Sequence, residues 1–118
     1  MHNFERLEVW IASIELSDEV HQLTRTFPKH ELYGMTSQIR RCSVSIPSNI
    51  AEGAGRKSNK EFLQFLSIAN GSAYELFTQL ILAFKAEYID EEKKNDLINK
   101  LRSIMKMLFR LIQRFSSE

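Results

Sequence analysis

Residues 40–57 read Arg-Arg-Cys-Ser-Val-Ser-Ile-Pro-Ser-Asn-Ile-Ala-Glu-Gly-Ala-Gly-Arg-Lys and interrupt an otherwise regular helical pattern. Apolar residues recur every four positions through this stretch, at Cys42, Ile46 and Ile50, which is typical of one side of a helix. Pro47 falls inside the same pattern, where a proline removes one backbone hydrogen bond and crowds the carbonyl four residues earlier. The stretch therefore predicts a helix that kinks or breaks at Pro47.

The residues before this stretch have the pattern of amphipathic helices. A first helix is expected over about 7–26, because Pro28 steers the residue before it out of the helical region. Its apolar side is set by residues three and four apart: Leu7, Trp10, Ile11, Ile14, Leu16, Val20, Leu23 and Phe27. The helix that contains Pro47 is expected to begin near Glu31, with Leu32 and Met35 on its apolar side.

After the glycines that close residues 40–57, two long helices follow. Ser58 and Glu61 have the spacing of a capping box, so the third helix is expected to begin there and to run to about Tyr88. Asp90 is the expected N-cap of the fourth. The fourth helix has apolar residues alternating four and three apart: Leu97, Leu101, Ile104, Leu108, Leu111 and Phe115. This pattern predicts an all-α fold, an antiparallel up-down-up-down four-helix bundle, as one domain over residues 1–118.

The third helix has more apolar surface than the core of one bundle needs. A second apolar stripe flanks its core stripe and consists of Phe77, Ile81, Phe84 and Tyr88. We interpret these four residues as an interface between subunits, so the bundle is expected to be a homo-oligomer.

Composition agrees with a small helical protein of a reducing compartment. The chain has 118 residues with only four glycines and two prolines, too few for a β-rich fold with many tight turns. No membrane span or secretion signal is recognisable, and a single cysteine, Cys42, cannot form an internal disulfide. We therefore expect a cytoplasmic protein in which Cys42 is a small buried side chain.

One polar stripe accompanies Pro47. Six residues fall within about a third of the circumference if the helix continues through the proline: Arg41, Ser45, Ser48, Asn49, Glu52 and Arg56. In a structural interpretation Glu52 pairs with Arg56, and the Ser45 and Asn49 side chains satisfy the carbonyl freed by the proline. In a functional interpretation Arg41 and Arg56, with Lys57 and Lys60, form a phosphate-binding patch beside the third helix.

The fourth helix carries a basic row, defined by Arg102, Lys106, Arg110 and Arg114, with no acid between them. The residues recur every four positions and so lie along one face. Such a row is either a solvated face or an electrostatic surface for the phosphate backbone of a nucleic acid.

Catalytic and ligand-binding motifs are not recognisable in the sequence. It has no nucleophile-and-base grouping, phosphate loop, dinucleotide fingerprint or metal-ligand pair on a helix face. Trp10, Tyr33 and Tyr74 are expected to be packed rather than available for base stacking. The protein is thus expected to be non-enzymatic, with no cofactor, no metal, no membrane association and no small-molecule substrate.

Several motifs resemble a known family. They include Phe4-x-x-Leu7-x-Val9-Trp10, Ser45-Ile-Pro-Ser-Asn-Ile-Ala-Glu-Gly53 and Ala69-x-Gly71-Ser72-x-x-Glu75-Leu76. They resemble the small helical proteins of the 23S rRNA intervening-sequence family, which are distantly similar to the accessory variability protein of diversity-generating retroelements. The resemblance implies a left-handed four-helix bundle that assembles into a ring, as a homopentamer, and suggests a role in binding RNA.

Two functional hypotheses follow. In the first, a non-enzymatic oligomer contacts structured RNA or a ribonucleoprotein through the basic row, together with Arg41, Arg56, Lys57 and Lys60. In the second, a ring-shaped scaffold binds another protein and no nucleic acid.

Overall fold

Four long helices make up most of the chain. The computed structural model describes residues 2–117, and within them it contains no β-strand. The elements in order are η1 (Phe4–Arg6), α1 (Glu8–Thr24), η2 (Lys29–Glu31), α2 (Met35–Ala54), α3 (Asn59–Lys85) and α4 (Glu91–Ser116). The predicted all-α class is confirmed.

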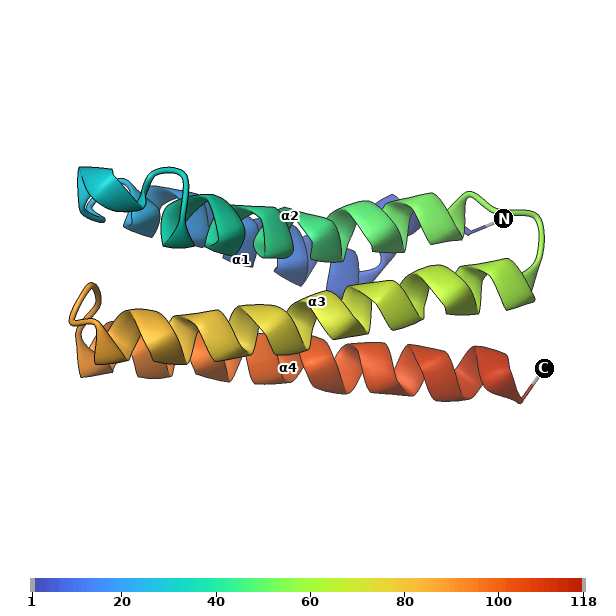
Figure 1. Cartoon of the computed structure of the whole chain (residues 1–118). Helices are drawn as coiled ribbons and strands as arrows, with labels where there is room; N and C mark the ends of the chain where they lie inside the picture. The colour runs from blue at the N-terminus through green and yellow to red at the C-terminus, as the bar shows by residue number, and fades with distance from the viewer. Residues whose placement is uncertain (1, 118) are drawn as a thin grey trace.

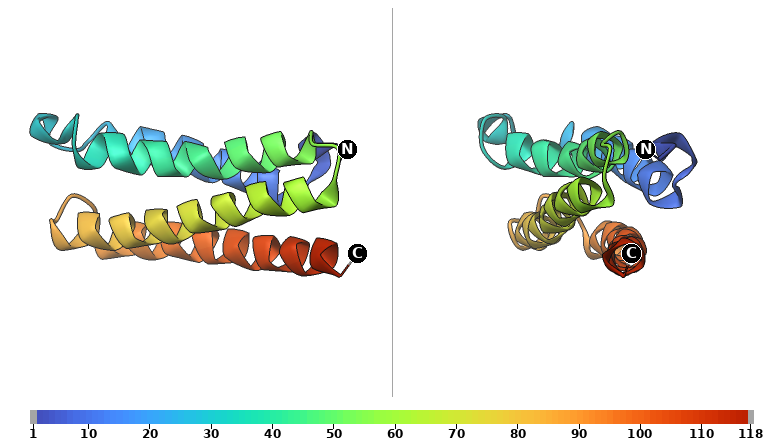
Figure 2. Two further views of the ribbon diagram at one scale, coloured as in Figure 1. Left: turned by 45° about the vertical axis from the view of Figure 1, so that its right-hand side comes forward. Right: turned by 90° about the vertical axis from the view of Figure 1, so that its right-hand side faces the viewer.

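The helices lie lengthwise beside one another in a body of 45 × 24 × 20 Å. Figure 1 shows the α2–α3 connection at the end where both termini lie, and the other two connections at the opposite end. Each helix contacts two neighbours, in the pairs α1–α2, α2–α3, α3–α4 and α1–α4. The end-on view in Figure 2 shows α3 and α4 below α1 and α2, so that α2 and α4 are diagonal to each other.

The core runs the length of the body. Its largest fully buried side chains are Leu16, Ile39, Ile46, Ile50, Phe62, Leu66, Leu76, Leu80, Leu97, Leu101, Ile104 and Leu108. Each such side chain contributes about 1.5–3 kcal/mol of transfer free energy when it leaves water. The apolar pattern of α4 is confirmed, because its residues are buried except Leu111, which is partly buried.

The buried face of α1 differs from the prediction. Ile11 and Ile14 were placed on the apolar side but are exposed, and the core face includes Ser13, Ser17 and Thr24 instead. Small hydroxyl side chains can occupy these positions because their hydrogen-bonding groups are satisfied there, for Ser17 by the hydroxyl of Ser43 on α2. Ser13 Oγ donates to the Trp10 carbonyl, and Thr24 Oγ1 donates to the His21 carbonyl.

The start of α2 also lies later than expected. The helix begins at Met35 rather than near Glu31, and Leu32, which was placed on its apolar side, is exposed. Residues 29–31 form the 3-10 turn η2. A carboxylate oxygen of Glu31 accepts a hydrogen bond from the backbone N–H of Met35 at 3.3 Å, which satisfies one free donor of the first turn.

Pro47 does not break α2, which continues through it to Ala54 as one helix (Figure 1). A proline here costs one backbone hydrogen bond. Pro47 is itself buried, so its ring adds apolar packing that offsets this loss.

The predicted starts of α3 and α4 are confirmed. Ser58 Oγ accepts a hydrogen bond from the backbone N–H of Glu61 and donates one to its carboxylate, and Asp90 Oδ1 accepts from the backbone N–H of Lys93 at 2.7 Å. At the other end of α3, Glu87 has a positive φ of 65°. The backbone N–H groups of Glu87 and Tyr88 donate to the carbonyls of Phe84 and Ala83, which forms a Schellman motif without its usual glycine.

A side-chain pair joins the first and third connections. Tyr88 Oη donates to Glu31 Oε2 at 2.7 Å, and the Tyr88 ring lies 5.3 Å from that of Phe27. The hydrogen bond from Tyr88, with a second from the Met35 backbone, lowers the pKa of Glu31 below its ordinary value of 4.5.

The most extensive helix interface lies between α2 and α3. A Cβ atom at Gly53 would lie 2.6 Å from Cβ of Phe65 and 3.0 Å from Cδ1 of Phe62. No side chain fits there, so Gly53 sets how closely the two helices approach.

We predict that Gly53→Ala destabilises the protein by roughly 1–3 kcal/mol, because the added methyl group forces α2 and α3 apart. Gly71→Ala is the matched control, since nothing lies within 4 Å of a Cβ at residue 71. There the better helix propensity of alanine should stabilise the protein by up to about 1 kcal/mol. Urea unfolding measures the free energy of unfolding of both variants. Equal changes in the two variants would contradict the close contact between α2 and α3 at Gly53.

A second prediction concerns pH. Because the pKa of Glu31 is lowered in the folded state, its contribution to stability is present above about pH 4.5 and is lost as pH falls through the folded pKa. Tyr88→Phe should therefore lower the melting temperature at neutral pH, and the difference from the wild type should shrink below pH 4.5. The control is Tyr33→Phe, at a tyrosine that is 94% exposed, which should leave the melting temperature unchanged both at neutral pH and below pH 4.5. A difference that stays constant down to pH 3 would rule out this linkage.

Candidate nucleic-acid interface

The basic row lies on the outer surface of α4. Arg102, Lys106, Arg110 and Arg114 are all exposed, as the spacing predicted. Within residues 2–117, none of the four forms an ion pair. Their charges are therefore not neutralised by the described part of the chain.

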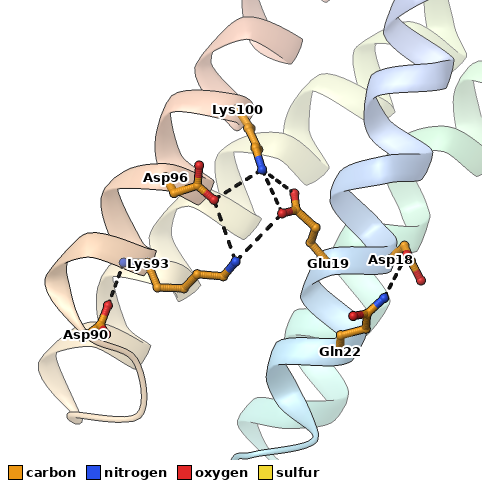
Figure 3. A network of polar contacts seen from close by, with 7 residues as sticks. All are labelled: Asp18, Glu19, Gln22, Asp90, Lys93, Asp96 and Lys100. Atoms are coloured by element: carbon orange, nitrogen blue, oxygen red, sulfur yellow. Dashed lines mark hydrogen bonds and ion pairs between the residues drawn. The ribbon is translucent and has the colours of Figure 1, made fainter.

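Two other cations of the same helix form ion pairs. Lys100 Nζ lies 2.8 Å from Oε1 of Glu19 on α1 and 3.3 Å from Oδ2 of Asp96 (Figure 3). Lys93 Nζ lies 3.8 Å from each of the same two carboxylates. The hydrogen bond with Glu19, and then that with Asp96, raises the pKa of Lys100 above its ordinary value.

Helix geometry separates Lys100 from the N-terminal end of the basic row. At 100° per residue, Lys100 and Arg102 point about 200° apart, to opposite flanks of α4, the first toward the acids of α1 and the second against α3. Each later residue of the row turns back by about 40°, so that Arg114 points only about 40° from Lys100. Arg110 accordingly also lines a second hollow, with Leu7, Glu8 and Val9.

A groove lies between α3 and α4 along the second flank. It is a hollow of about 520 Å³ lined by Tyr74, Arg102, Met105, Lys106, Phe109 and Arg110. Tyr74 is 58% exposed and Phe109 is 60% exposed, and none of the six lining residues is acidic. We call this hollow the α3–α4 groove.

Trp10, Tyr33 and Tyr74 were expected to be packed, and for two of these three residues the expectation is wrong. Tyr33 and Tyr74 are exposed, and only Trp10 is partly buried, with its ring 5.2 Å from that of Phe4. Tyr74 directly follows the buried Ala73, but one further residue turns it by about 100°, out of the core. Phe109 was not singled out from the sequence, although it lies between Lys106 and Arg110 and outside the apolar heptad pattern.

The proposed subunit-interface stripe is partly covered within the chain. Phe77, Ile81, Phe84 and Tyr88 are all partly buried against the core. The Arg102 guanidinium lies 5.0 Å from the centre of the Phe77 ring, and Lys94 Nζ lies 4.4 Å from that of Phe84. Larger apolar exposure occurs elsewhere, at Ile11, Ile14, Val44, Ile68 and Leu82.

The polar stripe of α2 is largely paired internally. Ser45 Oγ lies 2.7 Å from Ser72 Oγ on α3, and Asn49 Nδ2 donates to the carbonyl of Ser45 at 2.8 Å. Pro47 has no N–H to donate to the carbonyl of Ser43. Asn49 does not replace that donor, because its amide donates to the carbonyl of Ser45 instead. Arg56 pairs with Glu52 at 3.0 Å and lies over the Phe65 ring at 4.8 Å.

The remaining candidate cations lie outside α4, on α2 and at the start of α3. Arg41, Lys57 and Lys60 are exposed. Arg41 lies on α2, which is diagonal to α4, so α3 separates it from the row. Lys57 and Lys60 lie at the start of α3, beside the N-cap Ser58.

Cys42 is buried, as predicted. Burial, reinforced by the charge of Glu75, raises the pKa of its thiol to about 12, so the thiol stays protonated at neutral pH. Across residues 2–117 no cluster of three His, Cys, Asp or Glu side chains could hold a metal ion. In the same part of the chain no helix is both long enough and apolar enough to cross a membrane.

The fold thus defines a protein of four long helices with an unneutralised basic surface on α4. The chain belongs to the 23S rRNA-intervening sequence protein family, whose sequence profile matches residues 5–110. It is similar to the crystal structure of a protein of unknown function from the S23 ribosomal protein family of Bacteroides thetaiotaomicron, at 29% identity and a TM-score of 0.83. That similarity covers 89% of this chain and 95% of the other. A search of curated proteins finds no match.

Proposed function

We propose that this protein is a non-enzymatic helical bundle that binds structured RNA, alone or in a ribonucleoprotein, through the basic row of α4. Phosphate contacts from exposed arginine and lysine supply most of the sequence-independent affinity for nucleic acid. Membership in a family named for an insertion in ribosomal RNA supports RNA as the ligand.

One observation carries this proposal: the ion pairs of α4 involve Lys93 and Lys100 and none of the four residues of the basic row. Lys93 and Lys100 hold α1 through Glu19, whereas the basic row has no ion pair within residues 2–117. A row of like charges four residues apart repels itself mildly, and a phosphate backbone would relieve that repulsion. Arg41, Arg56, Lys57 and Lys60 have a secondary role in this proposal: Arg41 lies on α2, across α3 from the row, and the other three lie in the α2–α3 connection and the start of α3.

The second part of the proposal is assembly. An antiparallel up-down-up-down bundle associates into a ring of identical subunits, a homopentamer, which repeats the basic row around the assembly. Exposed apolar side chains on α1 and α3, together with the stripe Phe77, Ile81, Phe84 and Tyr88, are the candidate contacts. We further propose a cytoplasmic location, since the lone Cys42 is reduced and buried.

The alternative is a ring-shaped scaffold that binds another protein and no nucleic acid. The exposed Ile11 and Ile14 on α1 favour it, because apolar side chains on one helix face are common at protein contacts. In this alternative the basic row is only a solvated face.

The RNA proposal predicts that the triple variant Arg102→Gln, Lys106→Gln and Arg110→Gln loses RNA affinity. The measurement is fluorescence anisotropy with 23S rRNA fragments at several salt concentrations. The slope of log K against log[salt] should become shallower by roughly two to three. The control is the triple variant Arg25→Gln, Lys29→Gln and Lys85→Gln, which removes the same charge from exposed residues elsewhere. Equal losses in the two variants, or no binding by the wild type at low salt, would refute RNA binding through this row.

The assembly proposal predicts a particle of about 69 kDa, five times the 13.8 kDa subunit, in sedimentation velocity at micromolar concentration. A mass of 13.8 kDa would refute assembly. A ring-sized particle with no affinity for rRNA fragments would support the scaffold alternative.

A further inference from the structure

We propose that the α3–α4 groove binds unpaired bases of RNA, so that the preferred ligand is a single strand, loop or bulge rather than a continuous duplex. This inference rests on the proposed function and specifies which feature of an RNA the protein recognises. It depends on the two aromatic side chains of the groove and on their position among the cations.

Tyr74 and Phe109 are more than half exposed, from two different helices, and they line the same hollow. Apolar rings gathered in one hollow with polar groups around them are a feature of interaction sites. Bases that are not paired present flat faces that stack on such rings, and each stacked base contributes substantially to affinity. In a duplex the same faces are already stacked on neighbouring bases.

The cations are arranged to hold the strand that carries these bases. Lys106 and Arg110 lie on either side of Phe109 in the sequence, and both line the groove without an ion pair within residues 2–117. Arg102 is held over the Phe77 ring at 5.0 Å, which orders its guanidinium group at the groove. The groove therefore combines base-stacking and phosphate-binding groups, which is the combination found in single-strand sites.

A second copy of the chain is the rival occupant. The exposed face of α1 has Glu8 and Glu15 beside Ile11 and could meet a basic, aromatic groove. Three cations without an ion pair line the groove, whereas the α1 face of a second copy offers only the two acids Glu8 and Glu15. The phosphates of an RNA strand therefore neutralise these cations more completely than a second copy does. The mass of the particle distinguishes the two occupants.

The test compares one RNA strand alone with the same strand annealed to its complement, at fixed salt. The wild type should bind the single strand more tightly. Replacing both rings, Tyr74→Ala with Phe109→Ala, should weaken single-strand binding by roughly tenfold or more and change duplex binding less than twofold. The conservative pair Tyr74→Phe with Phe109→Tyr should keep the affinity.

The control is Tyr33→Ala with Val44→Ala, which removes exposed side chains outside both the groove and the proposed subunit contacts and should leave binding unchanged. If the wild type binds neither RNA, the proposed function fails. If it binds both equally, and the alanine pair at residues 74 and 109 changes nothing, only this inference fails. If that pair reduces the mass of the particle, the groove is a contact between copies and the inference is overturned.

Discussion

The arrangement of the helices depends on a contact between α2 and α3 that leaves no room for a side chain at residue 53. The Cβ of Phe65 and the ring of Phe62 lie against the backbone of Gly53. This contact fixes the α2–α3 pair, which has the most extensive interface in the protein. Because interiors are close-packed, a change in that approach would be transmitted to α4, which contacts α3 and α1 but not α2 within the described residues.

The position of α4 decides which of its charges are used within the fold. Glu19 and Asp96 hold Lys93 and Lys100, so the flank toward α1 is neutralised (Figure 3). On the other flank Arg102 lies over the Phe77 ring of α3, and the row then turns back toward α1, where Arg110 lines a hollow with Glu8. A chain of formal net charge +1 can thus present a locally basic surface, because the ion pairs of α4 use Lys93 and Lys100 and leave the row without one within residues 2–117.

Periodicity and capping residues were enough to predict the helices and their starts at Ser58 and Asp90, because these signals are local. The local rule left a kink or a break open at Pro47, and the helix does not break there, since a buried proline ring gains packing that the sequence does not reveal. On α1, apolarity selected Ile11 and Ile14 over the small hydroxyl residues that actually face the core. The basic row was predictable from its spacing, but the groove was not, because Tyr74 and Phe109 come together only when α3 and α4 pack.

The most direct test of the account is ultraviolet cross-linking of the unmodified protein to rRNA fragments, followed by mass spectrometry of the cross-linked peptides. Ultraviolet light joins bases to side chains that they touch, so the method reports the contact surface without any substitution. The account predicts nucleotide adducts on peptides that contain Tyr74 or Phe109. Adducts confined to α2 peptides around Arg41 and Arg56, or the absence of any adduct, would contradict it.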